Sequence, residues 1–229
     1  MPISLFGRAK RESAKVLEEG WLLYAKPTTL EPVGTLFRID DAKRRFIVDQ
    51  VAVDTQTGAE AAAKVQQRVQ ADIGFFARFL GIDSYRGELG ARDAEALEFE
   101  ILNPERQFAS DAAMDRVLAS ALAALKYRAD NRYYIIRETR SATAMTYRLT
   151  QAQLGEIGGE ASLALAIGLG ANAAAGEGSL YEINQVFPAR MRVMFLAEEI
   201  APVRAGLAAG APLLGRRPVR QPLIWTEGA

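Results

Sequence analysis

The stretch Leu163–Leu169 reads Leu-Ala-Leu-Ala-Ile-Gly-Leu, so large apolar residues alternate strictly with small ones. Because successive side chains of a β-strand point to opposite faces, one face of such a strand is wholly apolar and the other is nearly bare. A half-buried strand of a soluble protein usually carries polar side chains on its second face. The pattern therefore predicts either a tightly buried strand or a strand whose apolar face meets lipid. The large apolar residues are Leu163, Leu165, Ile167 and Leu169.

The segments on both sides of this stretch also have strand character. They are Arg132–Thr139, Met145–Thr150, Leu180–Phe187 and Met191–Leu196. In the second of these, Met145, Tyr147 and Leu149 alternate with threonine and arginine, which is typical of a strand with one apolar face. Pro188 separates the last two and predicts a break between them.

In the N-terminal half, predicted strands are interspersed with predicted helices. The strands are Trp21–Tyr24, Gly34–Ile39, Phe46–Val53 and Leu97–Ile101. Residues 40–43 suit a hairpin turn between the second and third strands, and Asn103-Pro104 ends the fourth. The predicted helices are a basic amphipathic one over residues 7–19, one over Gly58–Leu80 and one over Asp111–Lys126, for which Ser110 or Asp111 is the N-terminal cap.

After Ile200 the composition changes. Residues 201–222 contain four prolines and several glycines, which predicts an extended tail or linker and no part of the core. The tail is followed by the apolar motif Leu223-Ile224-Trp225. An apolar motif on such a tether is expected to dock into its own domain or into a partner.

Composition excludes several classes of chemistry. The chain has 229 residues, with neither cysteine nor histidine, so disulfides, Cys/His zinc sites and histidine bases are ruled out. Lys+Arg 28 balance Asp+Glu 28, and no nucleic-acid motif is visible, so no nucleic-acid partner is expected. The acidic pairs Asp40/Asp41, Glu98/Glu100 and Glu198/Glu199 lie at turns, on polar strand faces or at strand ends, where carboxylates are common. No catalytic residue, metal site or cofactor is therefore predicted.

Targeting signals are also absent from the sequence. No window of about 18 residues lacks charge, so no transmembrane helix is predicted. Charged residues interrupt the N-terminal region, which excludes a signal peptide and predicts a protein made soluble in the cytoplasm. The basic residues of the first predicted helix suit either a solvated surface or attachment to anionic lipid. They include Arg8, Lys10, Arg11 and Lys15.

The order of these motifs resembles that of the bacterial gasdermins, pore-forming proteins related to the gasdermins of animal cell death. The resemblance spans most of residues 15–200 and rests on short strings in a consistent order. The strings are Glu18–Leu23, Val51–Gln56, Ala96–Ile101, Tyr133–Thr139, Met145–Leu149, Gly158–Leu169, Ser179–Glu182 and Arg192–Phe195. They resemble, in turn, the opening strand of the family, the approach to its first inserting hairpin, the strand that closes it, the next pair of strands, the last hairpin and the closing strand.

The resemblance implies an α+β fold with a twisted, mainly antiparallel sheet and packed helices, able to refold into long membrane β-hairpins. Residues 1–200 would be the pore-forming domain, and residues 201–229 a C-terminal tail that acts as an autoinhibitory peptide. An activating protease would cut near that peptide. The released body would oligomerise into a large β-pore in the bacterial inner membrane and kill the host cell, which limits phage spread. Neither an enzymatic activity nor a cofactor is implied.

The resemblance also assigns roles to residues. Arg216, Arg217 and Arg220 are cleavage candidates, and Leu223, Ile224 and Trp225 are the autoinhibitory plug. Contact with anionic lipid is expected of the basic residues in the first helix. Contact with the membrane is expected of the apolar residues in two strands, Met145, Tyr147 and Leu149 in one, and Leu163, Leu165, Ile167 and Leu169 in the other.

Two other classes of function stay open at this point. The first is a non-enzymatic structural or assembly domain that docks on a neighbour through its apolar tail; deleting the tail would then lower self-association without causing membrane leakage. The second is an enzyme that works with carboxylates, lysine, serine or tyrosine alone. A buried cluster of such residues in a deep pocket would favour it.

Overall fold

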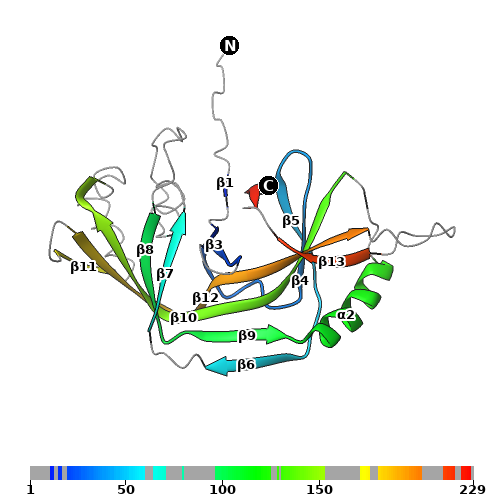
Figure 1. Ribbon diagram of the computed structural model, residues 1–229, viewed down its shortest axis with the longest axis horizontal. Helices are drawn as coiled ribbons and strands as arrows, with labels where there is room; N and C mark the ends of the chain where they lie inside the picture. Colours follow the sequence, from blue (N-terminus) through cyan, green and yellow to red (C-terminus); the bar gives the residue numbers. More distant parts are fainter. Residues whose placement is uncertain are drawn as a thin grey trace, which may run out of the picture.

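The computed structural model (Figure 1) describes residues 11–12, 15–16, 20–59, 64–70, 79, 96–124, 128, 130–152, 171–175, 180–202, 214–219 and 223–227. These residues form a 14-stranded sheet whose neighbouring strands are antiparallel except for one short parallel pair. One helix, α2 (Asp111–Ala124), covers part of the sheet. The prediction of a mainly antiparallel sheet is therefore confirmed for the described part of the chain.

Two long strands, β10 (Arg132–Thr150) and β12 (Leu180–Pro202), run through the middle of the sheet as an antiparallel pair. Their register extends from Tyr133 opposite Ile200 to Thr150 opposite Leu180. Each was expected to be two separate strands. Pro188 does not break β12, because it lies where the register shifts and the ladder is already interrupted.

Each central strand carries three short strands along its outer edge. On β10 they are β4 (Thr35–Ile39), β9 (Glu105–Ala109) and β8 (Ala96–Leu102). On β12 they are β13 (Leu214–Pro218), β3 (Leu22–Thr28) and β11 (Ala171–Ala175). The long pair thus acts as a spine that positions the rest of the sheet.

The remaining strands extend these edges. They are β5 (Arg44–Gln50) on β4, β6 (Thr55–Ala59) on β9, β7 (Lys64–Gln70) on β8, β2 (Lys15–Val16) between β7 and β3, and β1 (Arg11–Glu12) on β14 (Ile224–Glu227). Because β2 joins β7 to β3, the strands β10, β8, β7, β2, β3 and β12 form a closed hydrogen-bonded circuit. The C-terminal strand β14 joins the sheet through a parallel contact with β5.

Two predicted helices are wrong where the structure describes them. Residues 11–12 and 15–16 of the expected basic helix lie in the strands β1 and β2. Within Gly58–Leu80, β7 pairs with β8 along its whole length, and Phe79 alone has helical backbone among the described residues. The spacing of four residues between Val65 and Val69 fits one face of a helix and one face of a strand equally. The segment is a strand because it pairs with the edge of β8.

Other predictions of local structure are confirmed. The turn at residues 40–43 is closed by hydrogen bonds between Asp40 and Arg44, and Asn103 adopts a positive φ of 50° in the turn that follows β8. Helix α2 begins where expected, and the amide of Ala113 donates a hydrogen bond of 3.2 Å to the Ser110 hydroxyl. The stretch Leu163–Leu169 lies outside the described residues.

The core lies on both faces of the sheet, as the alternation in β10 requires. Tyr133 and Ile135 point to the face covered by α2, where Met114 and Leu118 are buried against them. Tyr134 and Ile136 point to the opposite face and belong to a second cluster. Its other buried members are Leu22, Tyr24, Phe37, Ile39, Phe195, Ala197 and Leu223.

Candidate functional site

The C-terminal segment is part of the folded body. Leu223 is only 3% exposed and is buried in the second cluster, against residues from β3, β4, β10 and β12. Aromatic contacts stabilise this pocket, with ring centroids 5.2 Å apart for Phe37 and Tyr134 and 4.6 Å apart for Tyr24 and Phe195. Of the predicted plug, Leu223 therefore docks into its own domain. Ile224 and Trp225 are described by their backbone, which pairs with Glu12 and Arg11 of β1.

The preceding strand, β13, is held by a group of ion pairs around a nearly buried arginine. The Arg216 side chain is 12% exposed and donates to Glu198 of β12 and, at 2.9 Å, to Asp115 of α2. Glu198 also accepts a hydrogen bond of 3.0 Å from Arg137 of β10. Arg216 therefore connects the C-terminal strand to β12 and to the helix.

A second set of ion pairs involves the next residue of each strand, Arg217 of β13 and Glu199 of β12. Glu199 accepts hydrogen bonds from Arg217 at 2.9 Å and from Arg132 at 3.1 Å. Burial alone would raise the pKa of Glu199, but these two hydrogen bonds outweigh it and hold the pKa of this carboxyl below its usual value. Glu199 is therefore ionised at neutral pH, as its role in holding β13 requires. We call Arg216, Arg217, Glu198 and Glu199 the tail clamp.

These contacts change the interpretation of residues 201–222. The expectation of an extended linker outside the core is wrong for Leu214–Pro218, which pairs with β12 over five register positions. Of the cleavage candidates, Arg216 is largely buried against Glu198 and Asp115, whereas Arg217 is 62% exposed. Arg220 lies outside the described residues. A protease requires extended, unpaired backbone, so β13 would have to leave β12 before a cut at Arg216 or Arg217.

We expect Arg216→Ala to loosen the C-terminal strand far more than Arg217→Ala. The first removes a nearly buried cation and leaves Glu198 with Arg137 only, which costs about 1.5–3 kcal/mol in the free energy of unfolding. The second removes a mostly exposed cation and costs about 0.2–1 kcal/mol. Urea unfolding of the two variants measures both values. Equal losses would show that Arg216 does not anchor the strand.

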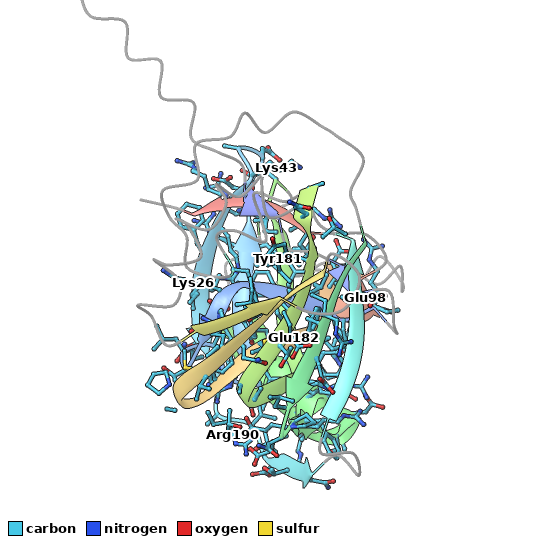
Figure 2. The ribbon with its side chains drawn as sticks, turned by 90° about the vertical axis from the view of Figure 1, so that its left-hand side faces the viewer. Lys26, Lys43, Glu98, Tyr181, Glu182 and Arg190 are labelled. Atoms are coloured by element: carbon cyan, nitrogen blue, oxygen red, sulfur yellow. The ribbon has the colours of Figure 1, made fainter. Side chains whose placement is uncertain are left out.

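A second feature is the amphipathic sheet formed by β7, β8, the end of β10, the beginning of β12 and β11 (Figure 2). Its apolar face is buried and contains Phe99, Ile101, Met145, Tyr147, Leu149 and Ile183, all at most 3% exposed. Phe79 covers this face, with its ring centroid 6.1 Å from that of Tyr147 in an edge-on arrangement. The described side chains of this face are thus mainly apolar. Gln185, which is opposite Met145 in register, is partly buried there and accepts a hydrogen bond of 2.8 Å from the Tyr147 hydroxyl.

The opposite face of the same strands is polar. Glu98, Glu100, Arg148, Glu182 and Asn184 are partly exposed on it, and Figure 2 labels Glu98 and Glu182 there. The carboxylate of Glu182 lies 3.7 Å from the Arg148 guanidinium, and Thr146 and Asn184 are hydrogen-bonded at 2.5 Å. Such strands have the pattern that a sheet needs in order to face lipid on one side and water on the other.

The structure describes some of the residues that are predicted to contact the membrane. Met145, Tyr147 and Leu149 are fully buried on the apolar face, so in this conformation they do not reach a membrane. The backbone of Arg11 lies in β1 and that of Lys15 in β2. Arg8, Lys10, Leu163, Leu165, Ile167 and Leu169 lie outside the described residues. The roles of all these residues in lipid contact stay predictions.

Sequence reasoning did not include Phe99, Ile101 and Ile183 among the functional residues, although they complete the apolar face. The alternation in Leu97–Ile101 was the signal, since it has the same period as that in Met145–Leu149. The ion pairs of the tail clamp had no such signal, because they join residues distant in sequence. Of the acidic pair Asp40/Asp41 at the turn, Asp40 has a structural role, because its carboxylate forms an ion pair with Arg44 at 2.8 Å.

Among the described residues, no helix is long and apolar enough to cross a membrane. The same part of the chain contains no group of three or more His, Cys, Asp or Glu residues placed to hold a metal ion.

Comparison with solved structures shows a similarity to a bacterial gasdermin. No protein-family model matches the sequence, and no curated protein matches it. The chain is similar to a structure of a bacterial gasdermin from Bradyrhizobium tropiciagri, with a TM-score of 0.49 and 12% sequence identity. The similarity covers 86% of this chain and 85% of that one.

Proposed function

We propose that this protein is the resting form of a pore-forming effector, restrained by its own C-terminal segment. The observation that carries the proposal is the amphipathic sheet, in which the strands β8, β10 and β12 share a buried, mainly apolar face and a polar opposite face. A pore needs this division, because lipid contacts one side of its wall and water the other. The resemblance of the sequence to bacterial gasdermins supports the same function.

The connections between these strands are suited to extension. β7 and β8 are joined by residues 71–95, and β10 and β12 by residues 151–179. A strand crosses a bilayer in about 9–11 residues, so each connection is long enough to add one such length to both strands that it joins. The predicted lipid-facing stretch Leu163–Leu169 lies in the second connection. If the pairs β7–β8 and β10–β12 were lengthened in their existing registers, each would become a longer hairpin.

The C-terminal segment supplies the restraint. Leu223 fills a pocket between four strands, and the tail clamp fastens β13 to the outer edge of β12. Both contacts must be lost before the part of the β12 edge that β13 covers, Glu198–Pro202, is free. Cleavage between β12 and β13 would make the segment a separate peptide that can dissociate. By its resemblance, the effector acts in cell death that limits phage, after an activating protease cuts the chain.

Dye release from anionic liposomes tests the proposal. A recognition sequence for a specific protease is inserted between Pro202 and Leu214 of the full chain, and the protein is cut in the presence of dye-loaded vesicles. We expect release after cutting and none before it. The same chain without the inserted sequence, treated with the same protease, is the control.

Complete cleavage without dye release would contradict the proposed function. If cleavage instead dissolved an oligomer, the C-terminal segment would have an assembly role, as the alternative interpretation of the sequence predicts. Sedimentation of the cut and uncut protein without vesicles separates these two results.

A further inference from the structure

The long pair of strands, β10 and β12, is interrupted near its middle. On one side of the interruption Ala142 stands opposite Met191, and on the other side Ala144 stands opposite Val186. Residues 187–190 of β12 therefore lie outside the ladder that joins the two strands. Extra residues of this kind form a bulge, which breaks the run of hydrogen bonds and lets a strand bend.

The strands on either side of this pair are interrupted at the same level. Along β10, β8 ends at Leu102 and β9 begins at Glu105, with Asn103 at a positive φ between them. Along β12, β11 pairs as far as Gln185 and β3 pairs from Arg192 onward. In Figure 1, β8 runs upward from this level, whereas β9 runs sideways. We call the interruptions together the hinge line, which comprises residues 103–104, 142–143 and 187–190.

The hinge line divides the described sheet into two parts with separate cores. One part is the amphipathic sheet, and its buried face has its own apolar residues, such as Phe99, Tyr147 and Ile183. The other part, which we call the trunk, comprises α2, β3–β6, β9, β13, β14 and the remaining lengths of β10 and β12. Both core clusters described above contain only residues of the trunk. Each part can therefore keep its core when the angle between them changes, which is what a hinge between rigid units requires.

Away from the hinge line, the two-residue strand β2 also joins the parts. It pairs with β7 of the amphipathic sheet at Val69 and Gln70 and with β3 of the trunk at Leu22. Because so short a strand supplies few hydrogen bonds, it restrains the angle between the parts only weakly.

The side chain of Arg190 spans the hinge line. Arg190 lies in the bulge of β12, at the lower end of the strands in Figure 2, and donates a hydrogen bond of 2.8 Å to the backbone carbonyl of Asn103. Since β10 lies between β12 and the turn at Asn103, this bond reaches across β10 from one interruption to the other. Beside it, the Asn103 amide donates a hydrogen bond of 3.2 Å to the Thr143 hydroxyl. These two bonds connect the three segments of the hinge line.

Arg190 also lies 3.8 Å from the carboxylate of Glu105, the first residue of β9. The two side chains are 37% and 39% exposed, so water screens this ion pair and it adds little. The hydrogen bond from the guanidinium to the Asn103 carbonyl is charge-assisted and is therefore the stronger of the two contacts.

We propose that the amphipathic sheet and the trunk change their angle at the hinge line, and that Arg190 is the latch that holds the resting angle. This inference goes beyond the proposed function, because it concerns a motion of the uncut chain in solution. Opening at the hinge line breaks few ladder hydrogen bonds, since the strands are already interrupted there. If the protein forms pores as proposed, the motion changes the direction in which the two strand pairs lengthen.

Hydrogen exchange of the full, uncut chain tests the latch. A ladder amide exchanges when its surroundings open, so its exchange rate reports the population of the open form. We expect Arg190→Ala to raise the exchange rate about fivefold for residues 141–144 and to leave residues 133–136 of the trunk unchanged. Arg192→Ala is the matched control. Arg192 lies two residues further along β12 and donates to the carbonyl of Thr29, but this bond stays within the trunk.

The distance between two spin labels tests the change of angle itself. The chain has no cysteine, so Ala119→Cys on α2 and Gln151→Cys just after β10 place the labels at two defined sites. Both residues are exposed, one on the trunk and one beyond the hinge line. We expect one main distance in the otherwise unaltered chain. In Arg190→Ala a second distance should appear, with its population raised about fivefold.

Two results would overturn the inference. Equal exchange rates in Arg190→Ala and Arg192→Ala would show that Arg190 is no latch. Faster exchange with an unchanged distance between the labels would mean that the strands fray locally and that the sheet has no hinge. Dye release by the unaltered cut chain is a separate measurement, and its absence would contradict the proposed function without affecting the hinge.

Discussion

Replacing Leu223 by alanine is expected to release the restraint without any cut. The side chain is 3% exposed and packs among residues of four strands, so its truncation leaves a cavity and costs about 2–5 kcal/mol. This cost falls on the contact between the C-terminal segment and the body. A loss of 2 kcal/mol raises the population of the detached state about 30-fold. We therefore expect the uncut variant to release dye from anionic liposomes and to unfold at lower urea concentration.

The matched control is Leu30→Ala. Leu30 is 71% exposed, so the same truncation should change the free energy of unfolding by less than about 0.5 kcal/mol and cause no leakage. If Leu223→Ala lost stability but did not leak, the C-terminal segment would be a structural part of the body and no restraint. If both variants behaved like the unaltered protein, the pocket would not hold the segment in solution.

The parts of the sheet that the sequence predicted are those whose signal is local. The alternation at Met145, Tyr147 and Leu149 identified a face that the structure shows to be fully buried. The turn at residues 40–43 and the cap of α2 followed from residues adjacent in the chain. In each case the preference of a short segment and its tertiary environment agree.

The predictions that were wrong concern segments whose structure is decided by distant partners. Val65 and Val69 suit a helix as well as a strand, and β7 is a strand because β8 offers it an edge. The proline- and glycine-rich composition after Ile200 described a flexible chain, yet Arg216 is held by Glu198 and Asp115. Composition reports local freedom, whereas these contacts join residues far apart in sequence. The tail clamp could therefore not be predicted from the sequence alone.

Replacing Gly34 by alanine is expected to be among the most destabilising single changes in the described part of the chain. Gly34 has a φ of +91°, and an added Cβ would lie 2.2 Å from the carbonyl oxygen of Val51 and 2.6 Å from Cγ2 of Val53. The backbone does not move aside freely, because Gly34 donates a hydrogen bond of 2.8 Å to Ile136 and accepts one of 3.2 Å from Val51. Backbone strain and overpacking together cost about 3–5 kcal/mol.

Gly58→Ala is the matched control for this prediction. Its added Cβ would meet nothing closer than Cε1 of Phe108 at 4.0 Å, so the change should alter stability by less than about 1 kcal/mol. Urea unfolding followed by tryptophan fluorescence compares the two variants. Similar stabilities would mean that residues 51–53 shift to make room. The expected difference would instead show that close packing at Gly34 fixes β4 against β10, and with it two strands that line the Leu223 pocket.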